Sequence, residues 1–339
     1  MKRRGNPAAC WGVGACLFVL LACSQMLRSQ VTAPKQPTNT AGNRSSSAQG
    51  TAAKEAASNE AEDTADSAFY SPNAVAVDSS GNVYIVDTYN NRVLKETPKG
   101  DSYTQSVVLD HGLFFCSGVA VDGGGNVYIV DSGDNRVLKE TPSGSSYLES
   151  TVGSDLRYPF SVAVDGGGNV YVTDTGNNRV VKETLAGGSY TQSVVVDSGL
   201  QFPTGIAVDG NGNVYVVDRD HQRVLKETPA GGSYTLGIVV DGDLDEPRGA
   251  AVDGSGNIYV ADTKNHRVLK EVPADGSFTQ RTVGTGLSYP MGVAVDGCGN
   301  IYIADYENRR VLKETLSGGS YTQSIVSASV RFPGGQSED

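Results

Sequence analysis

Histidine, cysteine and positive charge are all scarce in this sequence; so few cysteines exclude a disulfide scaffold, and the other two shortages limit the possible ligands. Of 339 residues, three are His and five are Cys, and the formal net charge is −11 at pH 7. Nucleic-acid-binding proteins neutralise phosphates with a basic surface, so we expect no nucleic-acid partner. Three histidines offer few candidates for metal ligands or for a general base, so we expect no cofactor.

The first 22 residues have the layout of a secretory signal. A positive start (Lys2–Arg4) precedes an apolar run over residues 8–22, which is short for a membrane-spanning helix of about 20 apolar residues. The run ends at Leu20–Cys23, which resembles a bacterial lipobox; this implies cleavage before Cys23 and acylation of its thiol. An ordinary cleaved signal or an uncleaved anchor is the alternative. We expect an exported lipoprotein of the bacterial cell membrane or outer membrane, or otherwise a secreted or periplasmic protein.

A polar tether and a short tail flank the repetitive part of the chain. Residues 23–66 are rich in Ser, Ala, Thr, Asn, Gln and Glu and show no apolar periodicity. Such a segment cannot bury enough surface to offset its ordering entropy, so we predict a disordered tether of roughly 35 Å. Residues 329–339 are interpreted as a tail.

Residues 67–328 contain six copies of one pattern, with a period of 43 or 44 residues. Each copy has four short apolar runs separated by Gly-rich turns, and no apolar stripe of helical period appears. Four strands per unit at this period predict an all-β, six-bladed β-propeller with four antiparallel strands per blade. Each blade should be one meander that runs from the innermost to the outermost strand, and the blades should start near residues 71, 115, 158, 202, 246 and 289.

The repeat resembles the NHL family of propellers. The matching stretches are Pro203–Asp209, Gly212–Asp218 and Asn177–Val180, and the resemblance covers about residues 70–326. The chain is similar to the extracellular sensor propeller of bacterial transmembrane serine/threonine kinases. No kinase motif is present in it, so the resemblance implies a sensor-type domain without catalysis.

Positions shared by all copies are predicted to be scaffold. The turn Asp209–Asn213 is similar to the start of an EF-hand loop, but Val214 and Asp220 stand where that loop needs Gly and Glu, so we expect a hairpin turn. A second Asp and an Arg five residues later, such as Asp218 and Arg223, should hold a polar loop by charge-assisted hydrogen bonds.

The two remaining cysteines, Cys116 and Cys298, fall in units two and six, at opposite ends of the first strand. A strand of roughly 16 Å keeps such positions far beyond the ~5–6 Å Cα separation of a disulfide. We predict no bond between them.

Function is expected where equivalent positions differ between copies. The loops that enter the first strand and the loops between the second and third strands should emerge on the same face. Aromatic and charged side chains in these loops suit a binding surface, although the aromatic ones could instead fill gaps between blades. The candidate ligand-binding residues are Tyr89, Phe115, Tyr158, Phe160, Arg219, Asp220, His221, Gln222, Arg248, Lys264, His266, Met291, Tyr306 and Glu307.

Three functions are compatible with these observations. We favour a monomeric, non-enzymatic binding or sensing propeller at the cell envelope, held to the membrane by an N-terminal lipid and recognising a protein, peptide or glycan. The first alternative is a metal-dependent lyase or hydrolase that uses His221, His266 and Asp220. The second is a structural envelope protein.

Overall fold

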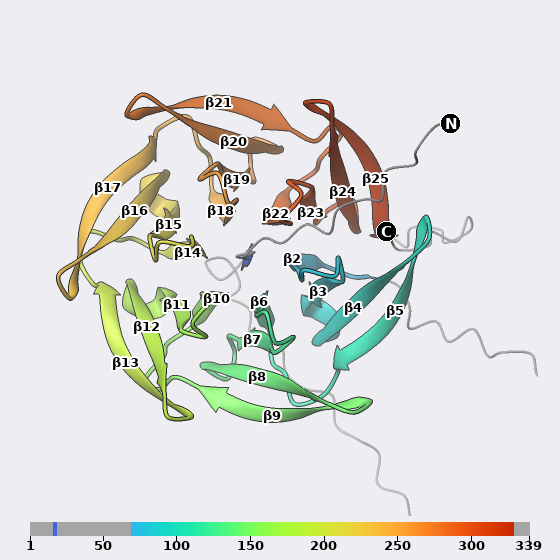
Figure 1. The fold of residues 1–339 in the computed structure, drawn as a ribbon, viewed down its shortest axis with the longest axis horizontal. Helices are drawn as coiled ribbons and strands as arrows, with labels where there is room; N and C mark the ends of the chain where they lie inside the picture. The colour runs from blue at the N-terminus through green and yellow to red at the C-terminus, as the bar shows by residue number, and fades with distance from the viewer. Residues whose placement is uncertain (1–15, 19–68, 329–339) are drawn as a thin grey trace, which may run out of the picture. The chain divides into compact units, whose positions relative to one another are not determined.

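The computed structural model describes residues 16–18 and 69–328 of the chain. Within this part each repeat forms a four-stranded antiparallel blade, and the six blades stand around a common centre (Figure 1). The strands of every blade follow one another in chain order from the innermost to the outermost position. The predicted all-β, six-bladed propeller and its meander topology are therefore confirmed.

The blades are numbered one to six along the chain. Blade one consists of β2 (Pro72–Val77), β3 (Val83–Asp87), β4 (Arg92–Lys99) and β5 (Ser102–Leu109), and blade two of β6 (Cys116–Val121), β7 (Val127–Asp131), β8 (Arg136–Ser143) and β9 (Ser146–Val152). Blade three has β10 (Pro159–Val164), β11 (Val170–Asp174), β12 (Arg179–Ala186) and β13 (Ser189–Val196). Blade four has β14 (Pro203–Val208), β15 (Val214–Asp218), β16 (Arg223–Ala230) and β17 (Ser233–Asp241). Blade five has β18 (Pro247–Val252), β19 (Ile258–Asp262), β20 (Arg267–Ala274) and β21 (Ser277–Val283), and blade six has β22 (Pro290–Val295), β23 (Ile301–Asp305), β24 (Arg310–Ser317) and β25 (Ser320–Ala328).

Short elements complete the described part. Three single 3-10 turns, η1 (Thr88–Asn90), η2 (Thr175–Asn177) and η3 (Arg219–His221), follow the second strands of blades one, three and four. A strand of three residues, β1 (Cys16–Phe18), pairs antiparallel with β2 and β22. No described residue belongs to a helix long and apolar enough to cross a membrane. The rest of the predicted signal, the tether with Cys23 and the tail lie outside the described residues.

The two inner strands of each blade are buried throughout because neighbouring blades cover both of their faces. In blade four, β14 and β15 expose none of their residues, whereas the outermost strand β17 is exposed over most of its length. This explains why the inner strands are nearly continuous in apolar residues. A Cβ added to Gly205 would clash with the carbonyl oxygen of Arg248 in the next blade, so the innermost strands meet backbone to backbone.

The predicted Asp–Arg scaffold pair is present in every blade. In blade four, the buried Asp218 accepts the Gln201 N–H at 2.7 Å on Oδ1 and the Arg223 Nε–H at 2.8 Å on Oδ2. Arg223 Nη2 also donates to the Gly199 carbonyl at 2.7 Å, so the pair fixes the loop that enters the blade. The same ion pair recurs at 2.6–3.0 Å in Asp87–Arg92, Asp131–Arg136, Asp174–Arg179, Asp262–Arg267 and Asp305–Arg310.

The first Asp of each repeat organises the predicted hairpin turn. Asp209 Oδ1 accepts the N–H groups of Asn211 and Asn213 at 2.9 and 3.0 Å. Its Oδ2 accepts Asn213 Nδ2 at 2.7 Å and the Tyr215 hydroxyl at 3.2 Å. Both carboxylate oxygens of Asp209 thus hold the turn. Burial raises the pKa of Tyr215, and the charge of Asp209 adds to this effect.

A hollow of about 280 Å³ lies between the turns of blades three and four. It is lined by Asp165, Gly166, Gly167, Asp209, Gly210 and Gly212.

Cys116 begins β6 as a buried free thiol. No disulfide therefore joins it to Cys298, as predicted. Its Sγ lies 4.0 Å from the carbonyl oxygen of Arg92 in the preceding blade, and burial raises the pKa of the thiol. Cys116 packs as a small apolar residue between blades one and two.

Candidate functional site

The loops that vary between repeats meet on one face of the ring. In blade four the Asp220 N–H donates to the Gln201 carbonyl at 3.1 Å, and in blade five the Lys264 N–H donates to the Asp245 carbonyl at 3.1 Å. Equivalent bonds join the same two loops in the other blades. The prediction that both sets of loops share one face is confirmed, and this surface is called the loop face below.

A hydroxyl contact links neighbouring blades beneath the loop face. The residue after the second Asp donates its hydroxyl to a carbonyl at the start of the next innermost strand, as Thr175 does to Pro203 at 2.6 Å. Blades one, two and five repeat this contact at 2.6–2.8 Å through Thr88, Ser132 and Thr263. Blade four has Arg219 at this position and blade six has Tyr306. The junctions that follow these two blades are therefore built differently.

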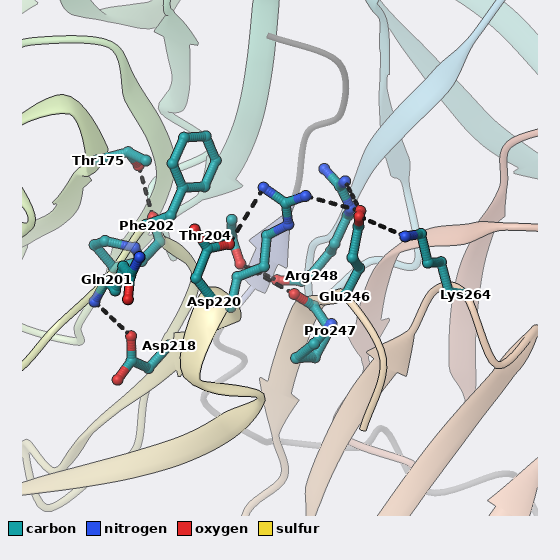
Figure 2. Close-up of polar contacts among 12 residues, drawn as sticks. Thr175, Gln201, Phe202, Thr204, Asp218, Asp220, Glu246, Pro247, Arg248 and Lys264 are labelled. Carbon is teal, nitrogen blue, oxygen red and sulfur yellow. Dashed lines mark hydrogen bonds and ion pairs between the residues drawn. The ribbon is translucent and has the colours of Figure 1, made fainter. Parts of the chain in front are cut away.

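Charged side chains occupy the junction between blades four and five (Figure 2). The Glu246 carboxylate accepts Arg219 Nη2 at 2.8 Å and Arg248 Nη2 at 2.6 Å on Oε2, and Lys264 Nζ at 2.8 Å on Oε1. Asp220 Oδ1 lies 3.6 Å from Arg219 Nη1. These five residues are called the Arg248 cluster.

Hydrogen bonds and ion pairs keep Glu246 and Arg248 charged in spite of their burial. Burial raises the pKa of the Glu246 carboxyl, but hydrogen bonds from Lys264 and Arg219 outweigh it and lower the pKa to about 2. Burial lowers the pKa of the Arg248 guanidinium to about 9, and the Arg219 charge adds to that effect. Glu246 and Arg248 are thus ionised at neutral pH, and the hydrogen bond to Glu246 raises the pKa of Lys264. With Asp220 as the second anion, the cluster has one net positive charge in a chain of net charge −11.

The guanidinium groups of this cluster keep unused donors. Arg248 is completely buried, yet its Nε and Nη1 have no hydrogen-bond partner among the described residues, and the same holds for Arg219 Nε. A guanidinium has five N–H donors, and a buried donor left unpaired costs about 1–3 kcal/mol. Arg219 is held over the Phe202 ring, with its Cζ 5.0 Å from the ring centroid. Two arginines therefore present fixed, unsatisfied N–H groups at this junction.

Arg248 belongs to a ring of residues that occupy the second position of each innermost strand. The other members are Asn73, Ser117, Phe160, Thr204 and Met291, all of them buried. Ser117 and Thr204 donate their hydroxyls to backbone carbonyls of the next blade, at 2.9 and 3.3 Å. Phe160 lies 6.0 Å from the Phe202 ring in an edge-to-face contact. Arg248 is the only ionisable residue in this ring.

The loop residue just before each innermost strand has strained backbone in five blades. Phe115, Tyr158, Phe202, Glu246 and Tyr289 have φ values from 43° to 58°, in the left-handed region that is uncommon for residues other than Gly. The preceding blade holds this conformation, since Asn135 Oδ1 accepts the Tyr158 N–H at 2.7 Å and Asn178 Oδ1 accepts the Phe202 N–H at 2.9 Å.

The two histidines on the loop face take positions that Asn occupies in other blades. His266 Nδ1 accepts the Tyr289 N–H at 3.1 Å, as Asn135 and Asn178 do for their partners, so its proton is on Nε2. His221 Nδ1 lies 2.8 Å from Asp218 Oδ2, where Asn177 Nδ2 bonds Asp174 Oδ2 at 2.8 Å in blade three. Residues 16–18 and 69–328 contain no group of three or more His, Cys, Asp and Glu placed to hold a metal ion.

Aromatic side chains form a row on the loop face that runs from the junction of blades six and one to the junction of blades one and two. Tyr89 lies edge-to-face with Tyr70 at 5.5 Å and with Phe115 at 6.4 Å, and Arg309 lies over the Tyr70 ring at 4.9 Å. Burial and the neighbouring Tyr306 raise the pKa of Tyr89. The exposed fractions of Tyr70, Tyr89, Phe114 and Tyr158 are 55%, 46%, 62% and 52%, so the loop face carries apolar surface.

The structure brings together only part of the predicted site. Arg219, Asp220, Arg248 and Lys264 lie in one cluster, whereas Phe160 and Met291 are buried between strands. The side chains of His221, Gln222, His266 and Glu307 are exposed and lie outside the cluster.

Sequence reasoning missed Glu246 at the centre of the cluster and Phe202 beneath Arg219. A signal was available for Glu246, because the equivalent position is aromatic in four other blades: Phe115, Tyr158, Phe202 and Tyr289.

The sequence profile of the NHL repeat matches residues 69–95, 156–182, 200–226 and 244–270, which fall in blades one, three, four and five. No curated protein matches the chain.

Solved structures with the same fold include both binding proteins and enzymes. A chain in the crystal structure of the nidogen/laminin complex is 23% identical with a TM-score of 0.60, over 69% of this chain and 90% of that chain. A streptogramin B lyase is 13% identical with a TM-score of 0.57, over 78% and 84% of the two chains. A gluconolactonase from Xanthomonas campestris is 18% identical with a TM-score of 0.58, over 71% and 84%. At these identities the similarity shows the fold alone.

Proposed function

Because the chain is a six-bladed β-propeller built from NHL repeats, we propose that it is a non-enzymatic binding protein that recognises a protein, peptide or glycan with its loop face. The concerted change at the junction of blades four and five carries this proposal. Arg219 replaces the hydroxyl residue that links neighbouring blades elsewhere, Glu246 replaces an aromatic residue, Arg248 replaces an uncharged residue, and each contacts another replaced residue. Such a coordinated departure suits a site that is selected for recognition.

The contacts of His221 and His266 favour a binding function over a catalytic one. The lyase or hydrolase alternative needs His221 and His266 as ligands or bases, but both make contacts that Asn makes in other blades. A matched pair of variants tests this alternative. His221→Asn/His266→Asn keeps the scaffold contacts, and under our proposal it leaves partner binding unchanged. Lactone hydrolysis or lyase turnover by the purified chain that disappears in this double variant would establish the enzymatic function instead.

The loop face is tested by photo-crosslinking of the full-length chain in its own cells. Tyr89 and Tyr158 are exposed on this face, and Leu148 and Leu236 are similarly exposed on the outermost strands β9 and β17. We expect Tyr89→Ser/Tyr158→Ser to lose a crosslinked partner that Leu148→Ser/Leu236→Ser retains. Identical crosslinks in both variants, or none in the parent chain, contradict recognition by the loop face.

We also propose that the protein is an envelope lipoprotein, monomeric and anchored through Cys23. The proposal rests on the Leu20–Cys23 motif after an apolar run. Cys23→Ser should move the protein from the membrane fraction to the soluble fraction. An unchanged membrane fraction in this variant refutes acylation and leaves the propeller's binding function untouched.

A further inference from the structure

The inference concerns the ligand of the Arg248 cluster and rests on the proposed binding function. We propose that this cluster binds the carboxylate of an acidic residue in a peptide ligand, which reaches Arg219, Lys264 and finally Arg248 from the loop face.

The internal ion pairs leave the Arg248 cluster incomplete. Among the described residues, Glu246 is the single carboxylate that contacts all three cations, and it engages only Nη2 of Arg248. The remaining Nε and Nη1 of this fully buried group have no partner among the described residues. A buried charge is tolerated when it is paired and its donors are satisfied. A second carboxylate at this position would satisfy both requirements.

The position of each cation suits entry from the loop face. The side chain of Lys264 is 43% exposed and that of Arg219 is 16% exposed, whereas that of Arg248 is not exposed at all. An incoming anion thus meets Lys264 and Arg219 before it meets Arg248. Arg219 Nε also has no partner within the described part of the chain, so a second guanidinium is available to the same anion. Planar guanidinium groups pair well with planar carboxylates.

The charge of the site favours a single carboxylate over a phosphate. Three cations oppose Glu246 and Asp220, so one added negative charge neutralises the cluster. A phosphate dianion would leave excess negative charge at a partly buried position, in a chain whose net charge is already −11. A monoanionic side chain is the better match.

The surroundings favour a peptide over a free carboxylic acid. Tyr89, Phe114 and Tyr158 expose 46–62% of their surface in the loops of blades one to three, on the same face as the Arg248 cluster. A small acid cannot cover these rings, whereas a peptide that extends from the cluster across the loop face can pack on them. The aromatic surface would add affinity, and the Arg248 cluster would select the acidic residue.

The test uses the purified full-length chain and heptapeptides that carry a neutral dye. Each peptide has one central Glu, and its twin has Gln at that position. Fluorescence anisotropy should show a subset of Glu peptides binding about tenfold or more tighter than their twins, because charge-assisted hydrogen bonds distinguish the pair. The ratio should fall to about one in Arg248→Met, and Arg309→Met is the matched control on the same face, which should preserve it.

A buried arginine can matter for folding, so a second variant accompanies Arg248→Met. Arg219→Met/Lys264→Met changes the two partly exposed cations and should also reduce the Glu-to-Gln ratio, with thermal unfolding recorded for every variant. A ratio that persists in both cluster variants while they remain folded overturns the proposal.

Other outcomes identify a different ligand or none. Displacement of the Glu peptides by millimolar inorganic phosphate, or tighter binding of a phosphoserine twin, assigns the site to phosphate and overturns the carboxylate. Equal binding of Glu and Gln peptides that is lost in Tyr89→Ser/Tyr158→Ser overturns the inference but leaves the proposed function standing. No binding by any peptide overturns the inference, and only a failure of the crosslinking experiment as well overturns both.

Discussion

The junction between blades three and four and the junction between blades four and five share one layer of contacts and differ in the layer above it. Both have the buried Asp–Arg pair, Asp174–Arg179 in one and Asp218–Arg223 in the other. Above the pair, Thr175 donates its hydroxyl to the Pro203 carbonyl at the first junction, whereas Arg219 bonds Glu246 at the second. One scaffold can therefore carry a neutral or a charged upper layer. The difference lies in residues that vary between the repeats, which is where we propose that ligand specificity lies.

The largest effect is expected from breaking the shared layer at either junction. Asp174→Ala and Asp218→Ala each leave a partly buried guanidinium without its carboxylate, together with an unpaired backbone N–H. Loss of one partner of a buried pair costs about 3–5 kcal/mol, so both variants should lower the urea midpoint by similar amounts. Asp174→Asn and Asp218→Asn, which keep an acceptor for the N–H, should be milder. A much smaller loss at one junction would show that the scaffold is not equivalent in the two places.

A smaller effect that is confined to the junction of blades four and five is expected from Glu246→Gln. The variant leaves three cations without their shared anion and should lose about 2 kcal/mol. Arg248→Met placed in the same chain should restore part of this loss, which a double-mutant cycle of urea unfolding measures. Strictly additive losses would mean that the two side chains are not energetically coupled.

The Glu246 carboxylate should also make the unfolding free energy depend on pH. Burial raises the pKa of Glu246, but Lys264 and Arg219 bring it down to about 2, below its ordinary value of 4.5. A lowered folded-state pKa stabilises the protein above pH 4.5, and this contribution is lost as the pH falls from 4.5 towards 2. Unfolding free energies of the parent chain and of Glu246→Gln should therefore converge over that range. A difference that stays constant down to pH 2 would contradict the sign of the shift.

His266 offers a test at the junction between blades five and six. His266→Ala removes the acceptor of the Tyr289 N–H and should cost about 1 kcal/mol, while His266→Asn should restore stability because Asn135 and Asn178 perform this role in other blades. Thermal unfolding of the pair measures the difference. An Asn variant as unstable as the Ala variant would show that His266 acts through its ring contact with Tyr289 instead.

The smallest effect is expected in blade two, where two like charges face each other. Glu149 is paired across the strands with Glu140, while Gln occupies the position in blades one, three, five and six. Burial and then the Glu149 charge raise the pKa of Glu140, so the repulsion costs stability at neutral pH and is relieved as the pH falls through the raised pKa. Glu149→Gln should stabilise the protein by roughly 0.5 kcal/mol at pH 7. No gain at pH 7, or a gain that persists at low pH, would argue against repulsion.

The sequence predicted the fold and its scaffold because those contacts repeat. Asp218 and Arg223 recur at fixed spacing in six copies, and a periodic pattern reports a periodic contact. The Arg248 cluster has no such signal, since Arg219, Glu246 and Arg248 each occur once at their positions. Variation singled out Arg219 and Arg248 as candidates, but it could not show that Glu246 joins them. That pairing depends on the left-handed backbone at Glu246, which sequence alone does not reveal.

Each blade completes its sheet within one repeat, from an innermost to an outermost strand, and the described residues exchange no strand between the first and last blades beyond the short β1. Among these residues, successive blades are joined covalently only by the segments that lead from an outermost strand to the next innermost one. The order of the blades around the ring is thus independent of where the polypeptide starts. A circularly permuted chain that begins at β18 would divide no blade, and it would place the Arg248 cluster across the new termini.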